Sequence, residues 1–271
     1  MIPIRTDLPM KKLIRPADSL AMFLKLATSL GWQDLRQSYR RSVVGPFWIT
    51  AGMGVQILTM GLVFSIIFKT DLADYLPFLA TSIIFWGLIA ASINDACMTF
   101  ISSESIIKQL NLPHHVYVVR VVWKNLLLAG HNIVILPLVL FWFSRLPGVT
   151  IISALPGLLI LVLNLSWITL LLGMLSARFR DMPPIIASCT TIAFYLTPVM
   201  WYPTLIDDNS LAHLLLGLNP IYHWLQVVRQ PFLGEWPTWE NWGLALLSAG
   251  IGWLVTMGVY KKYRNMIAYW V

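Results

Sequence analysis

The residues of this chain whose types could carry out acid-base chemistry are few. Asp207 and Asp208 form the only adjacent acidic pair, and no histidine lies beside them. A membrane enzyme would need a positioned base, a carboxylate pair or a metal site near the membrane surface. The histidines show no metal-ligand spacing; they are His114, His115, His131, His213 and His223. We therefore expect no catalytic residue and no metal site in this chain.

The chain also lacks the sequence pattern of a phosphate-binding ATPase loop. No glycine is followed by lysine, so a phosphate-cradling GxxxxGK loop cannot occur. The HExxH, GxSxG and GxGxxG patterns are absent too. If the protein works on ATP, another chain must hydrolyse it, and we expect no cofactor in this one.

One polar segment, residues 101–113, has the spacing of a docking element. It predicts a short helix that is capped by Ser102 or Ser103, ends before Pro113 and exposes polar side chains beside a small apolar face. Such a helix suits a groove on a partner, through which it would pass rigid-body motion. An ordinary surface loop is the alternative. The residues expected to take part in docking are Ser103, Glu104, Ile106, Ile107 and Lys108.

Aromatic side chains are in excess, with 13 Trp, 12 Phe and 9 Tyr. Aromatic faces stack on the apolar faces of sugar rings, so an aromatic-lined conduit would let a polymer slide. Helix packing or lipid contact is the competing explanation for any single ring. The candidate channel and gate aromatics are Phe47, Trp48, Phe64, Phe68, Phe85, Trp86, Phe194, Tyr195, Trp201 and Tyr202.

Composition places these residues in a membrane protein. Of the 271 residues 58% are hydrophobic and 11% are charged, against about 25% charged in a soluble domain. The net charge of +7 alone would suggest nucleic acid or a membrane surface, and the hydrophobic content favours the membrane. A span needs about 20 apolar residues, and helices satisfy their own backbone in lipid. Six such runs predict an all-α protein: 44–68, 76–100, 116–143, 149–175, 184–202 and 242–260.

The basic residues predict the orientation of these spans. Placing the N-terminus in the cytoplasm leaves only three basic residues on the outer side, Lys69, Arg145 and Arg229. The other Lys and Arg residues then fall inside, so both termini are expected in the cytoplasm.

Two segments do not fit a simple series of spans. Around residues 19–43, Trp32, Leu35, Tyr39 and Val43 recur at helical spacing, which predicts an amphipathic helix in the cytoplasmic interface. We therefore divide the chain into an N-terminal segment, 1–43, and a membrane domain, 44–271. Residues 203–240 are too polar to span and predict two short re-entrant helices on the outer side, broken at Asn219-Pro220.

Five motifs in the expected order resemble one family, the permease subunits of ABC type 2 polysaccharide exporters, which serve O-antigen, capsule and teichoic acid export. The resemblance covers nearly the whole chain. Its residues are Asp34-Leu35 with Tyr39-Arg40-Arg41-Ser42, Gly45 and Trp48; Ile106-Ile107-Lys108 with Leu112-Pro113; Ala177-Arg178-Phe179-Arg180-Asp181; Thr197-Pro198-Val199-Met200-Trp201-Tyr202-Pro203; and Asn219-Pro220 with Arg229. Gln33 stands where the family usually has Arg, and His114-His115 replaces its Arg-Glu pair.

The resemblance implies a homodimer in the bacterial inner membrane that encloses one channel, surrounded by membrane lipids and bound to two copies of a separate ATPase subunit that holds ATP and magnesium. Asp34, Arg40 and Arg41 would join the coupling segment in meeting that subunit. Pro198, Asn219, Pro220 and Arg229 would belong to the outer gate. The cargo implied is an undecaprenyl-linked polysaccharide, closest to an O-antigen, and no nucleic acid partner is expected.

Other functions stay open from sequence. The same fold could export capsule, teichoic acid, a drug or a small lipid, and a smooth aliphatic cavity would favour lipid. A membrane-embedded glycosyl or acyl transferase acting on lipid-linked sugar is the remote alternative, and it would depend on Asp207 and Asp208.

Overall fold

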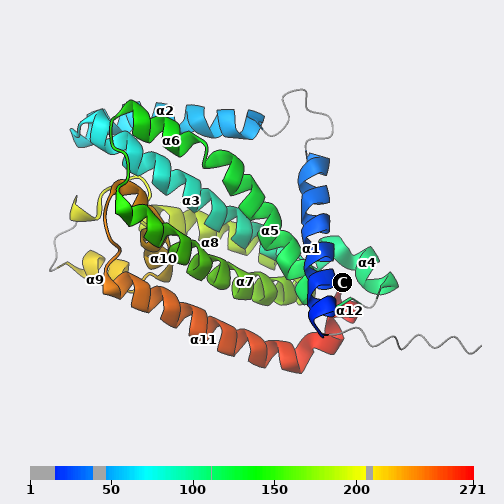
Figure 1. The fold of residues 1–271 in the computed structure, drawn as a ribbon. Coiled ribbons are helices and arrows are strands. Elements are labelled where there is room, and N and C mark those ends of the chain that lie inside the picture. Colours follow the sequence, from blue (N-terminus) through cyan, green and yellow to red (C-terminus); the bar gives the residue numbers. More distant parts are fainter. Residues whose placement is uncertain (1–15, 39–46, 111, 206–209) are drawn as a thin grey trace, which may run out of the picture.

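The computed structural model describes residues 16–38, 47–110, 112–205 and 210–271, and these residues form helices and connections without a strand (Figure 1). The longer helices run between two ends of the molecule. The elements are α1 (Pro16–Ser38), α2 (Phe47–Phe68), α3 (Leu72–Met98), η1 (Ile101–Ser103), α4 (Glu104–Gln109), α5 (His115–Asn132), α6 (Ile135–Trp142), η2 (Val149–Ser153), α7 (Ala154–Arg178), α8 (Met182–Leu196), η3 (Pro203–Leu205), α9 (Leu211–Gly217), α10 (Pro220–Arg229), η4 (Gln230–Leu233), α11 (Trp239–Tyr263), η5 (Arg264–Met266) and α12 (Ile267–Trp270).

Different helices mark the two ends of the bundle. Helices α1, α4 and α12 lie at one end, which we call the α4 end, and α9 and α10 lie toward the other, which we call the α10 end (Figure 1). The described C-terminal helix α12 packs beside α4. Which end faces the cytoplasm stays a prediction from the distribution of basic residues.

Five of the described stretches are long and apolar enough to cross a membrane: Phe47–Phe68, Leu72–Met98, His115–Trp142, Val149–Arg178 and Trp239–Trp270. They correspond to five of the six predicted runs. The run predicted at 184–202 contains α8, which has only 15 residues because it ends at Leu196, one residue before Thr197-Pro198. A residue that precedes proline is disfavoured in the helical conformation. The sixth span therefore stays a prediction.

The third run is divided, although one continuous stretch was predicted. Helix α5 ends at Asn132, and α6 begins at Ile135. Pro137 lies in the first turn of α6, where a missing N–H costs least. The proline favours a new helix start, and this explains the break.

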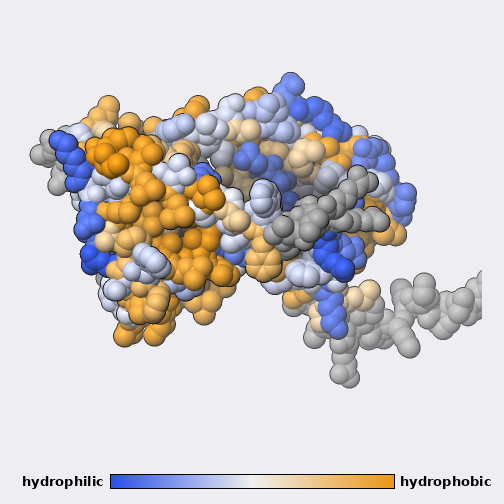
Figure 2. Space-filling view, turned by 90° about the horizontal axis from the view of Figure 1, so that it is seen from above, coloured by the Kyte–Doolittle hydropathy of each residue, from blue (hydrophilic) through white to orange (hydrophobic). Residues whose placement is uncertain are grey.

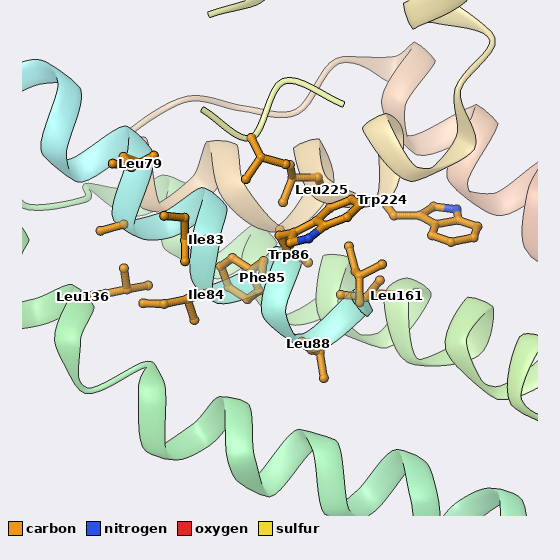
Figure 3. Packing of buried hydrophobic residues seen from close by; sticks show 14 of the residues in the cluster. Leu79, Ile83, Ile84, Phe85, Trp86, Leu88, Leu136, Leu161, Trp224 and Leu225 are labelled. Carbon is orange, nitrogen blue, oxygen red and sulfur yellow. The ribbon is translucent and has the colours of Figure 1, made fainter. Parts of the chain in front are cut away.

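Helix α3 is the centre of the bundle. It packs against α2, α5, α6, α7, α8 and α10, and most of its residues between Tyr75 and Ile89 are buried. Figure 3 shows Ile84 of this helix beside Leu136 of α6, with Leu161 of α7 near Trp224 of α10. A helix that is apolar all round is expected to be buried on all sides.

The outer helices expose apolar side chains instead. In Figure 2, which views the molecule from the side of α2 and α6, a wide apolar area covers the part of the bundle away from α1. Helix α2 contributes to this kind of surface with Val55, Leu58, Leu62 and Ile66, all exposed. Exposed apolar area of this extent is suited to lipid or to another membrane-embedded subunit.

Helix α1 packs on α5, and this corrects part of the predicted interface helix. Its buried face is formed by Ala27, Gly31 and Leu35 at four-residue spacing. An added Cβ at Gly31 would lie 2.8 Å from the Arg120 carbonyl oxygen, so the two backbones approach closely. Leu35, predicted to face lipid headgroups, is thus buried against protein, whereas Trp32 is exposed. Tyr39 and Val43 lie outside the described residues.

Gly157 allows α7 and α10 to touch through their backbones. A Cβ added at Gly157 would lie 2.9 Å from the carbonyl carbon of Val227 and closer still to its oxygen. We expect Gly157→Ala to lower the free energy of unfolding by about 1–3 kcal/mol, because the clash is with backbone and cannot be relieved by a rotamer change. Chemical unfolding in mixed micelles would measure this.

Gly250 in α11 is the matched control for Gly157, since an added Cβ there would meet no atom within 4 Å. Alanine at Gly250 should be neutral, or stabilising by up to about 1 kcal/mol through helix propensity. Equal losses of stability at Gly157 and Gly250 would contradict the close approach of α7 and α10.

Candidate coupling and gate sites

Helix α4 is attached to the bundle by its apolar side. Ile106 and Ile107 are half-buried against a cluster around Phe100, Tyr117 and Leu170. The apolar face predicted to dock into a partner is therefore largely turned inward, except at Leu110, which is exposed. A partner would meet the polar face of α4 instead.

Two charged side chains dominate that polar face. Lys108 Nζ lies 2.6 Å from Glu104 Oε1, one helical turn away, and both side chains are about half exposed. The Lys108 ammonium lowers the pKa of the Glu104 carboxyl. The Glu104 carboxyl is therefore ionised at neutral pH, and such an exposed ion pair contributes little to stability. Its charges are consequently available to a partner.

Ser103 lies beneath α4 and is not an exposed docking residue. It is fully buried. Its hydroxyl donates to the Thr99 carbonyl oxygen at 2.9 Å and accepts from Arg120 Nη1 at 3.3 Å. The predicted side-chain cap at Ser103 is wrong, because its oxygen already serves these two contacts and makes no cap hydrogen bond. Ser103 therefore contacts Arg120 and Thr99 inside the bundle and does not face a partner directly.

Arg120 of α5 joins α1 to the segment that carries α4. Its Nε and Nη2 donate to the two carboxylate oxygens of Asp34, each at 2.6 Å. Both side chains are less than about one third exposed, and forked pairs of this kind are the stronger ones. Together with the Ser103 contact, Arg120 ties α1, α5 and η1 at one point. Arg40 and Arg41, the other predicted coupling residues of the N-terminal segment, lie outside the described residues.

The candidate channel aromatics fall into two groups. Phe47, Trp48 and Tyr195 are exposed, so they are free to face lipid, a channel or a second subunit. Phe64, Phe68, Phe194, Trp201 and Tyr202 are half-buried.

Two of the predicted channel aromatics, Phe85 and Trp86, are core residues. They are 4% and 8% exposed and point into the core, where their rings pack on Phe232 and Phe194 with centroids 5.4 and 5.5 Å apart (Figure 3). The exposed surface of the subunit is therefore not formed by these two rings.

Short capped helices form the candidate gate. Asn219 Oδ1 accepts from the Ile221 backbone N–H at 3.0 Å and begins α10, with Pro220 at its first position. The Asn219 amide also donates to Thr197 Oγ1 at 2.9 Å, just after α8. The helix break thus coincides with Asn219-Pro220, as expected, and it is tied to the end of α8. Its role as a gate stays a prediction.

Arg229 is the best-enclosed charged residue of the described chain and is 1% exposed. Its Nη1 donates to Ser82 Oγ at 2.9 Å and to the Pro198 carbonyl oxygen at 2.7 Å, and its Nη2 donates to Gln226 Oε1 at 2.7 Å. Burial lowers the pKa of Arg229 to about 10, so the guanidinium is still charged at neutral pH. Its Cζ lies 4.6 Å from the centroid of the Phe78 ring. One cation therefore joins α3, the segment after α8 and α10.

Sequence reasoning missed several partners of these residues. Gln226 precedes Arg229 by three residues on an amphipathic helix, and this spacing could have indicated the contact. Ser82 and Phe78 are far away in the chain, and no local signal relates them to Arg229. Arg120 was considered only as one of the basic residues expected on the inner side. Among the described residues no group of His, Cys, Asp and Glu could hold a metal ion. Asp207 and Asp208 lie outside the described residues.

Comparison with known proteins identifies a family and relatives that match most of this chain. Residues 26–233 match the family model described as ABC-2 type transporter. The chain is 22% identical to the O-antigen export system permease protein RfbA of Klebsiella pneumoniae over 262 residues, which cover 91% of this chain and 99% of that protein. It is 24% identical to the protein of the same description from Myxococcus xanthus over 212 residues, 77% of this chain and 80% of the relative.

Proposed function

The chain belongs to the ABC-2 type transporter family, and we propose that it is the channel-forming membrane subunit of an ATP-driven exporter of lipid-linked polysaccharide. In this proposal two copies enclose the channel in the bacterial inner membrane, and two copies of a separate ATPase subunit supply the energy. The chain binds no ATP or magnesium itself, consistent with its lack of a phosphate-cradling loop.

The position of α4 is the observation that carries the coupling part of this proposal. The helix is half anchored through Ile106 and Ile107, and its charged face is open to a partner. It also lies one contact away from Arg120, which holds α1. A push on α4 would reach α1 and α5 through buried or half-buried groups, as rigid-body coupling requires.

The surface of α8 supports a polymer as the cargo. Pro184, Ser188, Thr191 and Tyr195 lie along one side of this helix and are all exposed. The Ser188 and Thr191 hydroxyls donate back to the Pro184 and Ala187 carbonyl oxygens, each at 3.0 Å. A strip of hydroxyls and one ring on an apolar helix fits a hydrated sugar chain better than it fits lipid tails. The relatives named for O-antigen export favour that polymer over capsule or teichoic acid. The lipid carrier would be an undecaprenyl lipid.

A charge reversal on α4 tests the coupling. We expect Glu104→Lys to reduce export by about ten-fold or more, because the new cation would be repelled by a partner surface that complements the Glu104 carboxylate. The measurement is complementation of a strain that lacks the gene, with polymer quantified in the cytoplasm and at the cell surface. ATP hydrolysis by the purified complex is measured in parallel.

Glu240→Lys is the control for Glu104, since Glu240 is also an exposed glutamate and lies at the start of α11, near the α10 end. This control should export normally. Export at the normal level by Glu104→Lys would sink the coupling role of α4, and a deletion strain that still delivers all of its polymer to the surface would sink the export function itself.

A further inference from the structure

A polar cavity lies beside Arg229 at the α10 end. It has a volume of about 430 Å³, within the range of about 300–1,000 Å³ usual for small-ligand pockets. Its walls come from the start of α3, the connection after α6, η3, α10 and η4. Segments distant in sequence thus converge on one space.

Two tyrosine rings form part of the walls of this cavity. Tyr202 and Tyr222 are both half-buried, so each keeps part of its ring open. The Tyr202 ring packs on Phe78 with centroids 4.3 Å apart. The Tyr222 ring packs on His223 with centroids 5.1 Å apart. Rings held in this way are rigid surfaces, and the axial C–H groups of a sugar ring stack well on such surfaces.

The polar groups of the cavity are already oriented by one another. Gln226 Nε2 donates to Tyr222 Oη at 2.8 Å, while Gln226 Oε1 accepts from Arg229. Because the Tyr222 oxygen accepts this bond, its own proton is directed elsewhere, and no acceptor for it is found among the described residues. Thr204 and Gln230 add further hydrogen-bonding groups to the wall. A ligand rich in hydroxyls would find donors and acceptors in place.

The charges of the cavity balance, and this decides the class of ligand. Its two cations are Arg145 and Arg229, and its two acids are Asp74 and Glu235. Arg145 is paired with Asp74, and Arg229 donates to neutral oxygens deep in the wall. A phosphate could reach the exposed Arg145 only in competition with the Asp74 carboxylate, and the Arg229 guanidinium is already held by its own acceptors. A neutral, hydroxyl-rich ligand with apolar faces fits better.

We propose that this cavity is a carbohydrate-binding site that takes one or a few sugar units of the exported polymer at the α10 end of each subunit. The inference rests on the proposed export function, whose polymer would pass this end. The open tyrosine rings stack on the sugar, and the Tyr222 hydroxyl and the neighbouring amides hydrogen-bond to its hydroxyls. Short-lived contacts of this kind would guide the polymer outward without trapping it.

The site can be tested by binding of lipid-free polysaccharide, released from the source strain, to the full chain with its ATPase partner in nanodiscs. Saturation-transfer difference NMR would report the binding. We expect Tyr222→Ala, which removes a stacking ring, and Thr204→Trp, which fills the cavity mouth, each to weaken binding by about ten-fold. Thr204 is exposed, so its variant is expected to fold even if Tyr222→Ala does not.

Trp236→Ala is the matched control. Trp236 is an exposed aromatic residue one position after Glu235 and does not line the cavity, so its loss should leave binding unchanged. Full binding by both cavity variants, or displacement of the polysaccharide by inorganic pyrophosphate, would overturn the carbohydrate site. If the wild-type complex still exports polymer in that case, the export function stands without the site. A wild-type complex that neither exports nor binds the polymer would overturn both.

Discussion

Arg229→Leu is expected to abolish export and to lower the free energy of unfolding by about 2–4 kcal/mol. Leucine fills part of the space but donates no hydrogen bond. The Pro198 carbonyl oxygen and Gln226 Oε1 would then be buried without their donor, whereas Ser82 Oγ keeps its bond to the Phe78 carbonyl oxygen at 2.7 Å. This loss of stability is partly offset, because the free-energy cost of burying the guanidinium also disappears. Chemical unfolding in mixed micelles and the complementation assay would measure the two effects.

Arg145→Leu is the control for this prediction. Arg145 lies at the same end and is also a cation, but it is exposed and pairs with an exposed carboxylate, Asp74. Such pairs contribute about 0–1 kcal/mol, so stability should change little. If Arg229→Leu were as stable as the control and still exported polymer, the joining of α3, α10 and the segment after α8 by Arg229 would be refuted.

Arg120→Glu is expected to uncouple ATP hydrolysis from export and to loosen α1 from α5. The change would place a carboxylate against Asp34, where the guanidinium now donates two bonds of 2.6 Å. Removing one partner of a buried pair costs about 3–5 kcal/mol, and partial exposure reduces this. We therefore expect the free energy that holds α1 against α5 to fall by about 2 kcal/mol. Hydrogen exchange of the α1 backbone amides would show it as faster exchange.

The reciprocal double variant, Asp34→Arg with Arg120→Glu, separates the ion pair from other effects of the substitution. It restores opposite charges across the same gap, while the Ser103 hydroxyl keeps its bond to the Thr99 carbonyl oxygen. Export and slow exchange of α1 should largely return. A double variant no better than the single one would show that the attachment of α1 depends on Gly31, Ala27 and Leu35 and not on the charges.

Much of the architecture could be predicted from the chain, because the signals are local. A span is defined by the length of an apolar run, and five predicted runs are matched by helices of sufficient length and hydropathy. The break at Asn219-Pro220 was predicted because the residue before a proline is disfavoured in a helix, and α10 begins there. The ABC-2 type resemblance, carried by short motifs in order, is confirmed by the family match.

Errors arose where the outcome depended on which face of a helix meets protein. Leu35 is buried against α5 and not against lipid headgroups, and Phe85 and Trp86 are core residues and not part of the exposed surface. An apolar residue has similar reasons to face lipid and to face another helix, so its periodicity cannot distinguish the two. The divided third run is a milder case, since Pro137 was visible but its effect depends on where the preceding helix ends.

The sequence by itself determined that the chain is helical, apolar over several long runs, without a GxxxxGK loop and similar to one transporter family. Each of these properties depends on residues that are close together in the sequence. Only the tertiary structure decided that Arg229 bonds to Ser82, 147 positions away, and that Asp34 is held by Arg120, 86 positions away. Such contacts depend on how helices pack, and a buried charge takes whichever partners that packing brings within about 3 Å of it.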